Sequence, residues 1–232
     1  MMRIYMLDVN SQSESISETE MTNRLEAAKK QLSEERQKKI ASLRFEKDQK
    51  LSLGAGMLLD LGLREYGVRE RDVLMAKGPV GKPYLPEHPE IHFNLSHSGN
   101  VAMAVFSDRE AGCDVEQIKK SVKRVADRFF CEPERQFLAE ADSEEEESRR
   151  FFQIWTLKES YLKVTGEGTH FPLDRFCIYR NPLRIQVDGR PAACSLYEYE
   201  LPGYRAAVCL EGEKPERNQD VFFSFQNLWD VV

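Results

Sequence analysis

The stretch WTLKESYLK (155–163) has the residue spacing of an amphipathic helix and decides how the rest of the chain is interpreted. At about 100° per residue, Trp155 and Leu162 share one apolar stripe, and Glu159 lies roughly 40° from Trp155 on that stripe. Glu159 and Lys163 also have the i, i+4 spacing of a weak surface ion pair. A carboxylate on an apolar stripe favours instead a polar site that faces the interior.

Lys158 is a second charged residue on the same stripe, which strengthens the case for an interior polar site. We expect this helix to run from Arg149 to Val164, because Thr165-Gly166 is a typical C-terminal stop. The acidic run SEEEES (143–148) just before it is predicted to be a solvated loop.

Two strand-like runs, VAMAVF (101–106) and GCDVEQI (112–118), are separated by SDREA and predict an antiparallel hairpin. Because side chains alternate along a strand, Asp114 and Glu116 share one face. Alone, the pair is better explained as the solvated side of a half-exposed sheet. Together with Glu159, it would supply three hard oxygen ligands of the kind that Mg²⁺ accepts.

A loop rich in Pro and Gly, KGPVGKPYLPEHPE (77–90), leads into IHFNLSHSGN (91–100). The hydroxyls of Ser96 and Ser98 and the ring of His97 form a donor-rich segment that could bind an anion. A hydrogen-bonded structural turn explains the same residues.

Other segments give coarser predictions. The N-terminal MMRIYMLDVNSQ predicts a strand, residues 33–66 are helical in character with Ser33 as the cap, and residues 121–138 are helical with a break near Pro133. The basic cluster Arg36, Lys38 and Lys39 has the composition of a solvated helix face. The short alternating runs after residue 175 predict a β-meander.

Composition limits the classes of function. The chain has 232 residues, 41% of them hydrophobic, and a net charge of −6, which argues against nucleic-acid and membrane-surface partners. No signal peptide or spanning segment is recognisable, so we expect a cytoplasmic protein. The cysteines are odd in number, widely spaced and without a C-x-x-C pair. We therefore expect reduced, mostly buried thiols at Cys113, Cys131, Cys177, Cys194 and Cys209.

Four blocks in order, GKPYLP (81–86), FNLSHSG (93–99), GCDVEQI (112–118) and WTLKESYLKVTGEG (155–168), resemble the surfactin-type 4′-phosphopantetheinyl transferase family. The most specific part is G-x-D-x-E followed by W-x-x-K-E-x-x-x-K. The resemblance implies an α/β (α+β) fold of two similar subdomains, each with a small, mainly antiparallel sheet and packed helices, related by a pseudo-twofold. It implies halves at 1–106 and 107–232, an active site in the cleft between them, and a monomer.

The resemblance also implies roles for individual residues. Asp114, Glu116 and Glu159 would bind Mg²⁺, and Lys163 would meet the pyrophosphate of coenzyme A, so that Glu159 and Lys163 are catalytic. Glu134 matches a position that the family assigns to a base, although the surrounding CEPERQ departs from its pattern. The full set of implied coenzyme A contacts is Arg36, Lys39, Ser52, Lys82, Pro83, Ser96, His97 and Lys163.

The implied function is transfer of the 4′-phosphopantetheine group of coenzyme A to a serine of an acyl- or peptidyl-carrier protein, with release of adenosine 3′,5′-bisphosphate. The alternative is a non-catalytic module that binds coenzyme A or a carrier protein. Whether the carrier belongs to fatty acid, polyketide or nonribosomal peptide synthesis stays open. A basic set that could dock an acidic carrier, or be only a solvated face, is Lys119, Lys120, Lys123 and Arg124.

Overall fold

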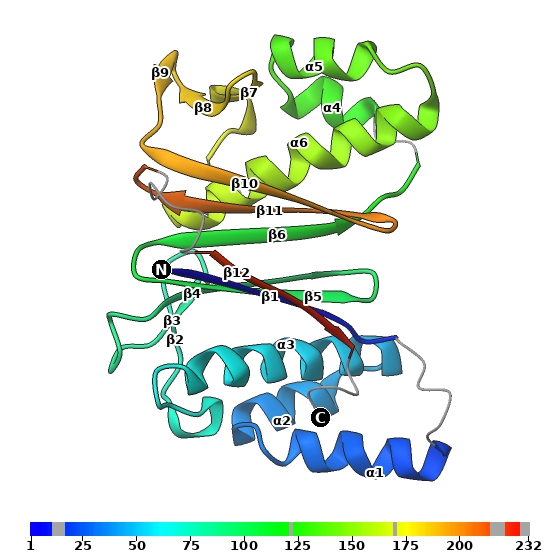
Figure 1. Cartoon of the computed structure of the whole chain (residues 1–232), viewed down its shortest axis with the longest axis vertical. Coiled ribbons are helices and arrows are strands. Elements are labelled where there is room, and N and C mark those ends of the chain that lie inside the picture. Colours follow the sequence, from blue (N-terminus) through cyan, green and yellow to red (C-terminus); the bar gives the residue numbers. More distant parts are fainter. Residues whose placement is uncertain (11–16, 121–122, 169–170, 214–220, 228–232) are drawn as a thin grey trace.

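Two β-sheets lie face to face at the centre of the molecule, and each carries helices on its outer side (Figure 1). The computed structural model describes residues 1–10, 17–120, 123–168, 171–213 and 221–227. Within these residues, no helix combines the length and the apolar character needed to cross a bilayer.

The first half of the chain forms one sheet with its helices and a separate two-stranded ribbon, β2-β3. Its elements are β1 (Met2–Asp8), α1 (Glu18–Lys29), α2 (Glu34–Ser42), α3 (Glu46–Arg64), β2 (Ala76–Lys77), β3 (Pro83–Tyr84), β4 (His92–Ser98) and β5 (Val101–Ser107).

The second half forms the other sheet, its helices and a small third sheet. Its elements are β6 (Ala111–Gln117), α4 (Lys123–Phe129), α5 (Glu132–Ala139), α6 (Glu144–Thr165), β7 (Phe176–Arg180), β8 (Leu183–Val187), β9 (Arg190–Pro191), β10 (Cys194–Leu201), β11 (Tyr204–Glu211) and β12 (Val221–Asn227).

The two halves repeat one topology. In each, a strand leads through helices to two antiparallel strands, and the last strand pairs with the first, giving the orders β1-β5-β4 and β6-β11-β10. This confirms the predicted fold class of two similar α/β subdomains. The division at residue 106 stays a prediction, and β12 lies in the sheet of the first half, parallel to β1.

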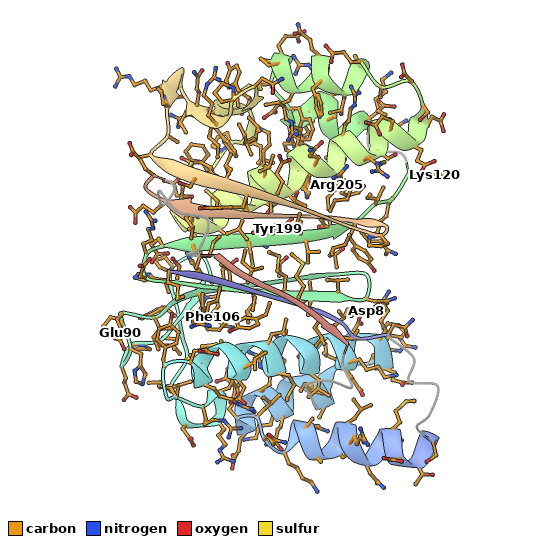
Figure 2. The ribbon with its side chains drawn as sticks, viewed as in Figure 1. Asp8, Glu90, Phe106, Lys120, Tyr199 and Arg205 are labelled. Carbon is orange, nitrogen blue, oxygen red and sulfur yellow. A yellow bond between two sulfur atoms is a disulfide. The ribbon has the colours of Figure 1, made fainter. Side chains whose placement is uncertain are left out.

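Three hydrophobic layers hold the sheets and helices together (Figure 2). Between the sheets, alternate residues of β1 and β5 face alternate residues of β6 and β11, including Cys113 and Val115. Phe106 and its neighbours fill the space between the first sheet and α3. On the outer side of the second sheet, the α6 residues Phe151 and Trp155 stack on each other and pack against Phe130 and Phe129 at the end of α4. The predicted facing of β6 is therefore confirmed: its apolar side chains lie in the layer between the sheets.

The predicted hairpin of residues 101–106 with 112–118 is wrong. β5 pairs with β1 and β4, whereas β6 pairs with β11 in the other sheet. The polar link at Asp108–Glu110 resembles a hairpin turn in sequence, but it carries the chain from one sheet to the other. The predicted meander is likewise divided between β7-β8-β9 and β10-β11.

The acidic run at 143–148 is not the predicted loop but the first turn of α6. Ser143 Oγ accepts a hydrogen bond from the Glu146 N–H at 3.1 Å, which caps the helix. Four glutamates in the first turn interact favourably with the positive end of the helix dipole. The helical region 33–66 is two helices, because Leu43 and Phe45 have extended backbones between α2 and α3.

The cysteine prediction is also wrong in part. Cys131, at the start of α5, forms a disulfide with Cys177 of β7, 46 residues along the chain. The other three cysteines are free, and Cys113 and Cys209 are buried as expected. The break predicted near Pro133 is confirmed, because α4 ends at Phe129 and α5 begins at Glu132; residues 121–122 lie outside the described part.

The edges of the two sheets meet where β4 and β6 run side by side in the same direction. Every second side chain of β4 accepts a hydrogen bond from every second backbone N–H of β6, and we call this row the β4–β6 seam. Its bonds run from Cys113 N–H to Asn94 Oδ1 at 3.0 Å, from Val115 N–H to Ser96 Oγ at 3.3 Å, and from Gln117 N–H to Ser98 Oγ at 3.1 Å.

Candidate functional site

Two of the predicted metal ligands are hydrogen-bonded to serines of the seam. Ser96 Oγ donates to Asp114 Oδ1 at 2.9 Å, and Ser98 Oγ donates to Glu116 Oε2 at 2.6 Å. Each serine therefore accepts from the backbone of β6 and donates to a carboxylate of the same strand. Asp114 is buried and Glu116 half-buried, so the seam fixes both carboxylates where the halves meet.

Helix α6 brings the other two predicted residues to this place, because Gly112 lets the helix approach β6 closely. A Cβ on Gly112 would lie only 2.1 Å from the carbonyl oxygen of Ser160. Lys163 Nζ consequently reaches β6, donating to Asp114 Oδ1 at 2.7 Å and to the Cys113 carbonyl at 2.8 Å. Glu159 lies one turn earlier on the same helix, close enough for the charge of Asp114 to act on it.

The carboxylates of this site destabilise one another's charged forms. Burial raises the pKa of Glu159, and the negative charge of Asp114 raises it further. Burial also raises the pKa of Glu116, against the lowering effect of its hydrogen bond from Ser98. Burial alone would lower the pKa of Lys163, but the charge and hydrogen bond of Asp114 raise it. Three carboxylates thus share one ammonium group, and the site is short of positive charge.

The donor set fits a divalent cation. Asp114 Oδ2 is buried and accepts no hydrogen bond from the residues that the structure describes, although an unpaired buried carboxylate oxygen is costly. Carboxylate oxygens are the ligands that Mg²⁺ prefers, and a cation would relieve the mutual repulsion of the three groups. Asp114, Glu116 and Glu159 are thus suited to hold the predicted ion.

Positive charge gathers on the neighbouring surface. Burial lowers the pKa of Lys39, and the cations of Arg36 and Lys77 lower it further. Desolvation lowers the pKa of His97, with Lys39 and Lys163 as the next causes. Burial is the larger cause of both shifts, and the additional lowering shows that several cations lie near one another, which is the arrangement that favours binding of a multiply charged anion.

Two further predicted contacts, Arg36 and Ser52, have contrasting surroundings. Arg36 Nε lies 3.4 Å from Glu70 Oε1, so one edge of its guanidinium already has a carboxylate partner. Ser52 Oγ, on α3, is buried and has no hydrogen-bond partner within the described part of the chain. The hydroxyl of Ser52 therefore keeps its hydrogen-bonding capacity.

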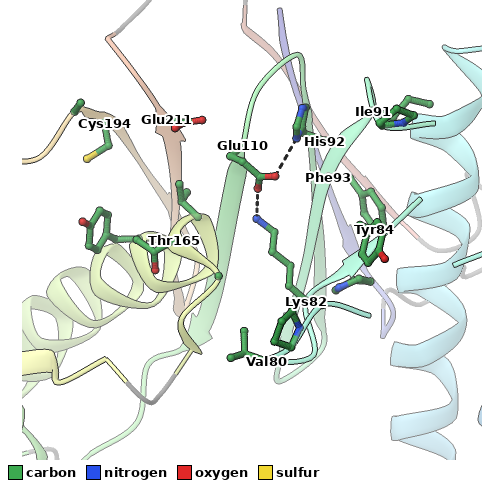
Figure 3. Close-up of a pocket in the computed structure, with 18 of the residues that line it drawn as sticks. Val80, Lys82, Tyr84, Ile91, His92, Phe93, Glu110, Thr165, Cys194 and Glu211 are labelled. Carbon is green, nitrogen blue, oxygen red and sulfur yellow. Dashed lines mark hydrogen bonds and ion pairs between the residues drawn. The ribbon is translucent and has the colours of Figure 1, made fainter. Parts of the chain in front are cut away.

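Lys82 and Pro83 line a cavity of about 900 Å³ between the two halves (Figure 3). One wall comes from residues 78–93 of the first half, and the other comes from the end of α6 and from residues 187–194. Lys82 Nζ donates to Glu110 Oε2 at 2.5 Å in this cavity. The structure therefore places the predicted adenine-side loop on an open, partly apolar space.

Comparison with known proteins agrees with this arrangement. The family model described as the 4′-phosphopantetheinyl transferase superfamily matches residues 110–209, and that described as 4′-phosphopantetheinyl transferase, N-terminal, matches residues 19–108. The 4′-phosphopantetheinyl transferase Sfp of Bacillus subtilis (strain 168) is 32% identical over 161 residues, which are 68% of this chain and 71% of that protein.

The 4′-phosphopantetheinyl transferase ffp of Bacillus subtilis is 31% identical over 73% of this chain and 76% of its own length. The chain belongs to the surfactin-type 4′-phosphopantetheinyl transferase family. Its function is accordingly the transfer of phosphopantetheine to carrier proteins, and the non-catalytic alternative is not favoured. Among solved structures, the holo-[acyl-carrier-protein] synthase of Thermotoga maritima shows a weak likeness, with a TM-score of 0.35 and 16% identity over 46% of this chain and 66% of that chain.

The structure does not bring Glu134 of the transferase together with the other carboxylates. Glu134 is 1% exposed, accepts from the Ile178 N–H at 2.7 Å, and lies 3.0 Å from the ammonium of the equally buried Lys158. Burial is the main cause that raises the pKa of Glu134 and lowers that of Lys158. With both oxygens bound inside the core between α5, α6 and β7, Glu134 has the surroundings of a structural group, and we do not carry the role of base forward.

Glu134 also belongs to the trio of potential ligand atoms that lie within 4.8 Å of one another in the described residues, with Cys131 and Cys177. Because the two sulfurs are bonded to each other, this trio is not a metal site. The same contacts account for Lys158, the second charged residue on the helix stripe: it holds Glu134 and the carbonyls of Leu173 and Phe176.

Sequence reasoning missed two charged residues of the transferase that lie at the site. Lys77 adds to the cationic surface beside Lys39, and Glu110 binds Lys82. Lys77 stands directly before the GPVGK turn, so its position next to a ligand loop was a usable signal. No sequence signal marked Glu110, because it lies in a segment with the composition of an ordinary polar turn.

Proposed function

We propose that this transferase moves 4′-phosphopantetheine from coenzyme A to a serine hydroxyl of an acyl- or peptidyl-carrier protein in a magnesium-dependent reaction at the β4–β6 seam. The serine oxygen bonds to the β-phosphorus and gives up its proton to solvent water, the bond from that phosphorus to the bridging oxygen breaks, and adenosine 3′,5′-bisphosphate leaves with the electron pair of that bond. The observation that carries the proposal is the convergence of Asp114, Glu116 and Glu159 with Lys163 where the two halves meet.

Asp114, Glu116 and Glu159 are the proposed magnesium ligands. When bound, Mg²⁺ supplies charge neutralisation to the pyrophosphate of coenzyme A. The protein's part is to hold the oxygens in place, and the hydrogen bonds from Ser96 and Ser98 orient two of the three carboxylates. The unpartnered Asp114 Oδ2 supports this assignment.

Lys163 is the proposed contact of the pyrophosphate. Its ammonium is fixed by Asp114, by the Cys113 carbonyl and by Ser96 Oγ at 3.1 Å, so little reorganisation is needed before it acts. A preorganised cation stabilises the negative charge that develops on the leaving phosphate oxygen.

The nucleotide half of coenzyme A is assigned to the cationic surface and the cavity. Arg36, Lys39 and His97 would bind the 3′-phosphate, with Ser52 as a hydroxyl donor and Lys77 as an additional cation. Lys82 and Pro83 would form the adenine-side wall of the cavity.

We propose that the transferase works as a monomer in the cytoplasm. Disulfides are rare in that compartment, so the Cys131–Cys177 disulfide is the observation that weighs against this location. The possible docking surface for an acidic carrier consists of exposed residues after β6 and at the start of α4. They are Lys119, Lys120, Lys123 and Arg124.

The test is Glu159→Gln, assayed with coenzyme A, an apo carrier protein and a Mg²⁺ titration, with the intact mass of the carrier as the readout. The amide keeps the shape of the side chain and removes the charge, so we expect transfer to fall by at least about 100-fold, by analogy with loss of one electrostatic group from an active site. Glu145→Gln, an exposed glutamate in the first turn of the same helix, is the matched control and should transfer normally.

Near-normal transfer by Glu159→Gln would overturn the metal assignment. Absence of any adduct with wild-type protein across acyl- and peptidyl-carrier proteins would overturn the catalytic function itself. A peptidyl carrier modified much faster than an acyl carrier would place the transferase in nonribosomal peptide synthesis.

A further inference from the structure

The carboxylate of Glu110 takes part in both interactions that are marked by dashed lines in Figure 3, one with Lys82 and one with His92. Both interactions cross the boundary between the halves. The backbone carbonyl of Glu110 accepts from the Glu211 N–H at 2.9 Å, which anchors it to β11 of the second half. Its side chain reaches the first half, where Oε2 accepts from Lys82 Nζ at 2.5 Å and Oε1 lies 3.2 Å from His92 Nδ1.

The loop that carries Lys82 is tight and projects from the first sheet. The Gly78 N–H donates to the Lys82 carbonyl at 2.9 Å, and the Gly81 N–H donates to the Gly78 carbonyl at 2.9 Å. The flanking strands β2 and β3 are two residues each and pair with each other. Such a short ribbon packs little apolar surface, so the long Lys82 side chain, which also donates to the Ala111 carbonyl at 3.1 Å, is a main attachment of the loop to β6.

We infer that Glu110 is a positioning residue: by binding Lys82 and His92 at once, it fixes the loop wall of the 900 Å³ cavity in the shape that receives the adenosine part of coenzyme A. This inference rests on the proposed function, since it takes coenzyme A as the ligand of that cavity. Glu110 touches no reacting atom in this assignment.

The electrostatics agree with the geometry. Burial alone would raise the pKa of Glu110, but the hydrogen bond and charge of Lys82, followed by those of His92, lower it. Glu110 is therefore held as a carboxylate, the form that accepts from both neighbours. Without that charge, the Lys82 ammonium keeps only the Ala111 carbonyl, and the loop gains freedom that ligand binding must then remove.

The test compares Glu110→Gln with Glu87→Gln. Glu87 is an exposed carboxylate on the loop between β3 and β4 that does not line the cavity, and its substitution leaves the contacts of Lys82 in place. We expect Glu110→Gln to raise the Kd for coenzyme A by about 3- to 10-fold, the size of a lost, partly exposed charge-assisted hydrogen bond, and to leave kcat at saturating coenzyme A within about twofold. Glu87→Gln should bind coenzyme A as the wild type does.

Adenosine 3′,5′-bisphosphate separates a positioning role from general damage, because it contains the nucleotide but not the pantetheine arm. Its Kd should rise in Glu110→Gln by the same factor as that of coenzyme A. In a protein that already carries Lys82→Met, Glu110→Gln should add little, since the interaction that it removes is already lost.

The inference is overturned if wild-type protein binds coenzyme A while Glu110→Gln binds it equally well, or if kcat falls and Kd does not change. It is also overturned if the Glu110 and Lys82 substitutions are additive. Failure of the wild type to bind coenzyme A, or to modify a carrier, counts instead against the proposed function.

Discussion

The two halves share a topology but place their close-approach glycines on opposite elements. In the first half the glycine is on the helix: a Cβ on Gly62 of α3 would lie 2.0 Å from the buried ring of Phe106. In the second half it is on the strand: a Cβ on Gly112 of β6 would lie 2.1 Å from the backbone oxygen of Ser160 in α6. Helix α3 therefore packs on a strand side chain, whereas the backbone of α6 packs directly on the backbone of β6.

This difference explains why only the second half carries the carboxylates of the site. Where the backbones of a helix and a strand are close, side chains at the rim of the contact converge, as Lys163 and Asp114 do at 2.7 Å. Where bulky side chains separate the two elements, as Phe106 does in the first half, the space is filled by core. A repeated topology thus supports a site in one copy and a plain hydrophobic layer in the other.

Gly112→Ala should have the largest effect, because the new methyl group meets backbone atoms that cannot rotate away. We expect a loss of about 3 to 5 kcal/mol in the free energy of unfolding and loss of carrier modification, since α6 must move off β6. Urea denaturation and the mass assay measure the two effects.

Gly54→Ala is the control in the first half, because its new methyl group would meet only the side-chain ends of Val9 and Leu7. The gain in helix propensity offsets much of this crowding, so its stability should stay within about 1 kcal/mol of the wild type. A Gly112→Ala variant as stable and active as Gly54→Ala would break the comparison between the halves.

The second difference is the buried charge on each main helix. Lys158 of α6 is fully buried against Glu134, whereas Asp60 of α3 is fully buried against Arg64 and Arg69, whose outer parts reach solvent. Lys158→Met leaves a buried carboxylate without its cation and should cost about 2 to 4 kcal/mol. Asp60→Asn leaves two hydrated arginines and should cost about 1 to 2 kcal/mol.

Chemical denaturation of the two variants tests this ranking, and the double variant Lys158→Met with Glu134→Gln should recover part of the loss. If Lys158→Met costs less than Asp60→Asn, the core pair of the second half contributes less than its burial indicates.

The smallest expected effect is the contribution of Asp60 to the change of stability at low pH. Burial alone would raise its pKa, but hydrogen bonds from Arg69, the Glu70 N–H and Arg64 lower it below the usual 3.8. A carboxyl group whose pKa is lower in the folded than in the unfolded state stabilises the fold above about pH 3.8, and this contribution is lost as the pH falls through the lowered value. Asp60→Asn should therefore reduce, by about 1 kcal/mol, the loss in free energy of unfolding that occurs on acidification. An unchanged loss on acidification would contradict the assignment.

Local patterns of the sequence predicted single helices and the alternation of side chains along a strand, because periodicity and alternation are properties of neighbouring residues; the roles of the site residues stay predictions. The helix at 155–163 and the shared face of Asp114 and Glu116 are examples. Pairing of elements was not predictable in the same way. Nothing in the link at 108–110 distinguishes a hairpin from a crossing between sheets, and nothing local connects Cys131 with Cys177.

The partners of buried charges were likewise beyond the sequence. Glu134 matched a catalytic position by motif, but only the fold shows that Lys158 and the Ile178 N–H occupy its oxygens. The acidic run SEEEES was predicted as a loop because its composition is typical of a solvated segment, and the position of Ser143 as a possible N-cap was not used.

The β4–β6 seam has a consequence for the cohesion of the molecule. Ser96 and Ser98 join the halves and hold Asp114 and Glu116 through the same hydroxyls, so separating the halves and releasing the carboxylates are one event. A ligand that binds across this seam only while the halves are together stabilises their contact by about 2.7 kcal/mol at 100 times its Kd. If coenzyme A binds at the seam as proposed, its binding also strengthens the contact between the halves.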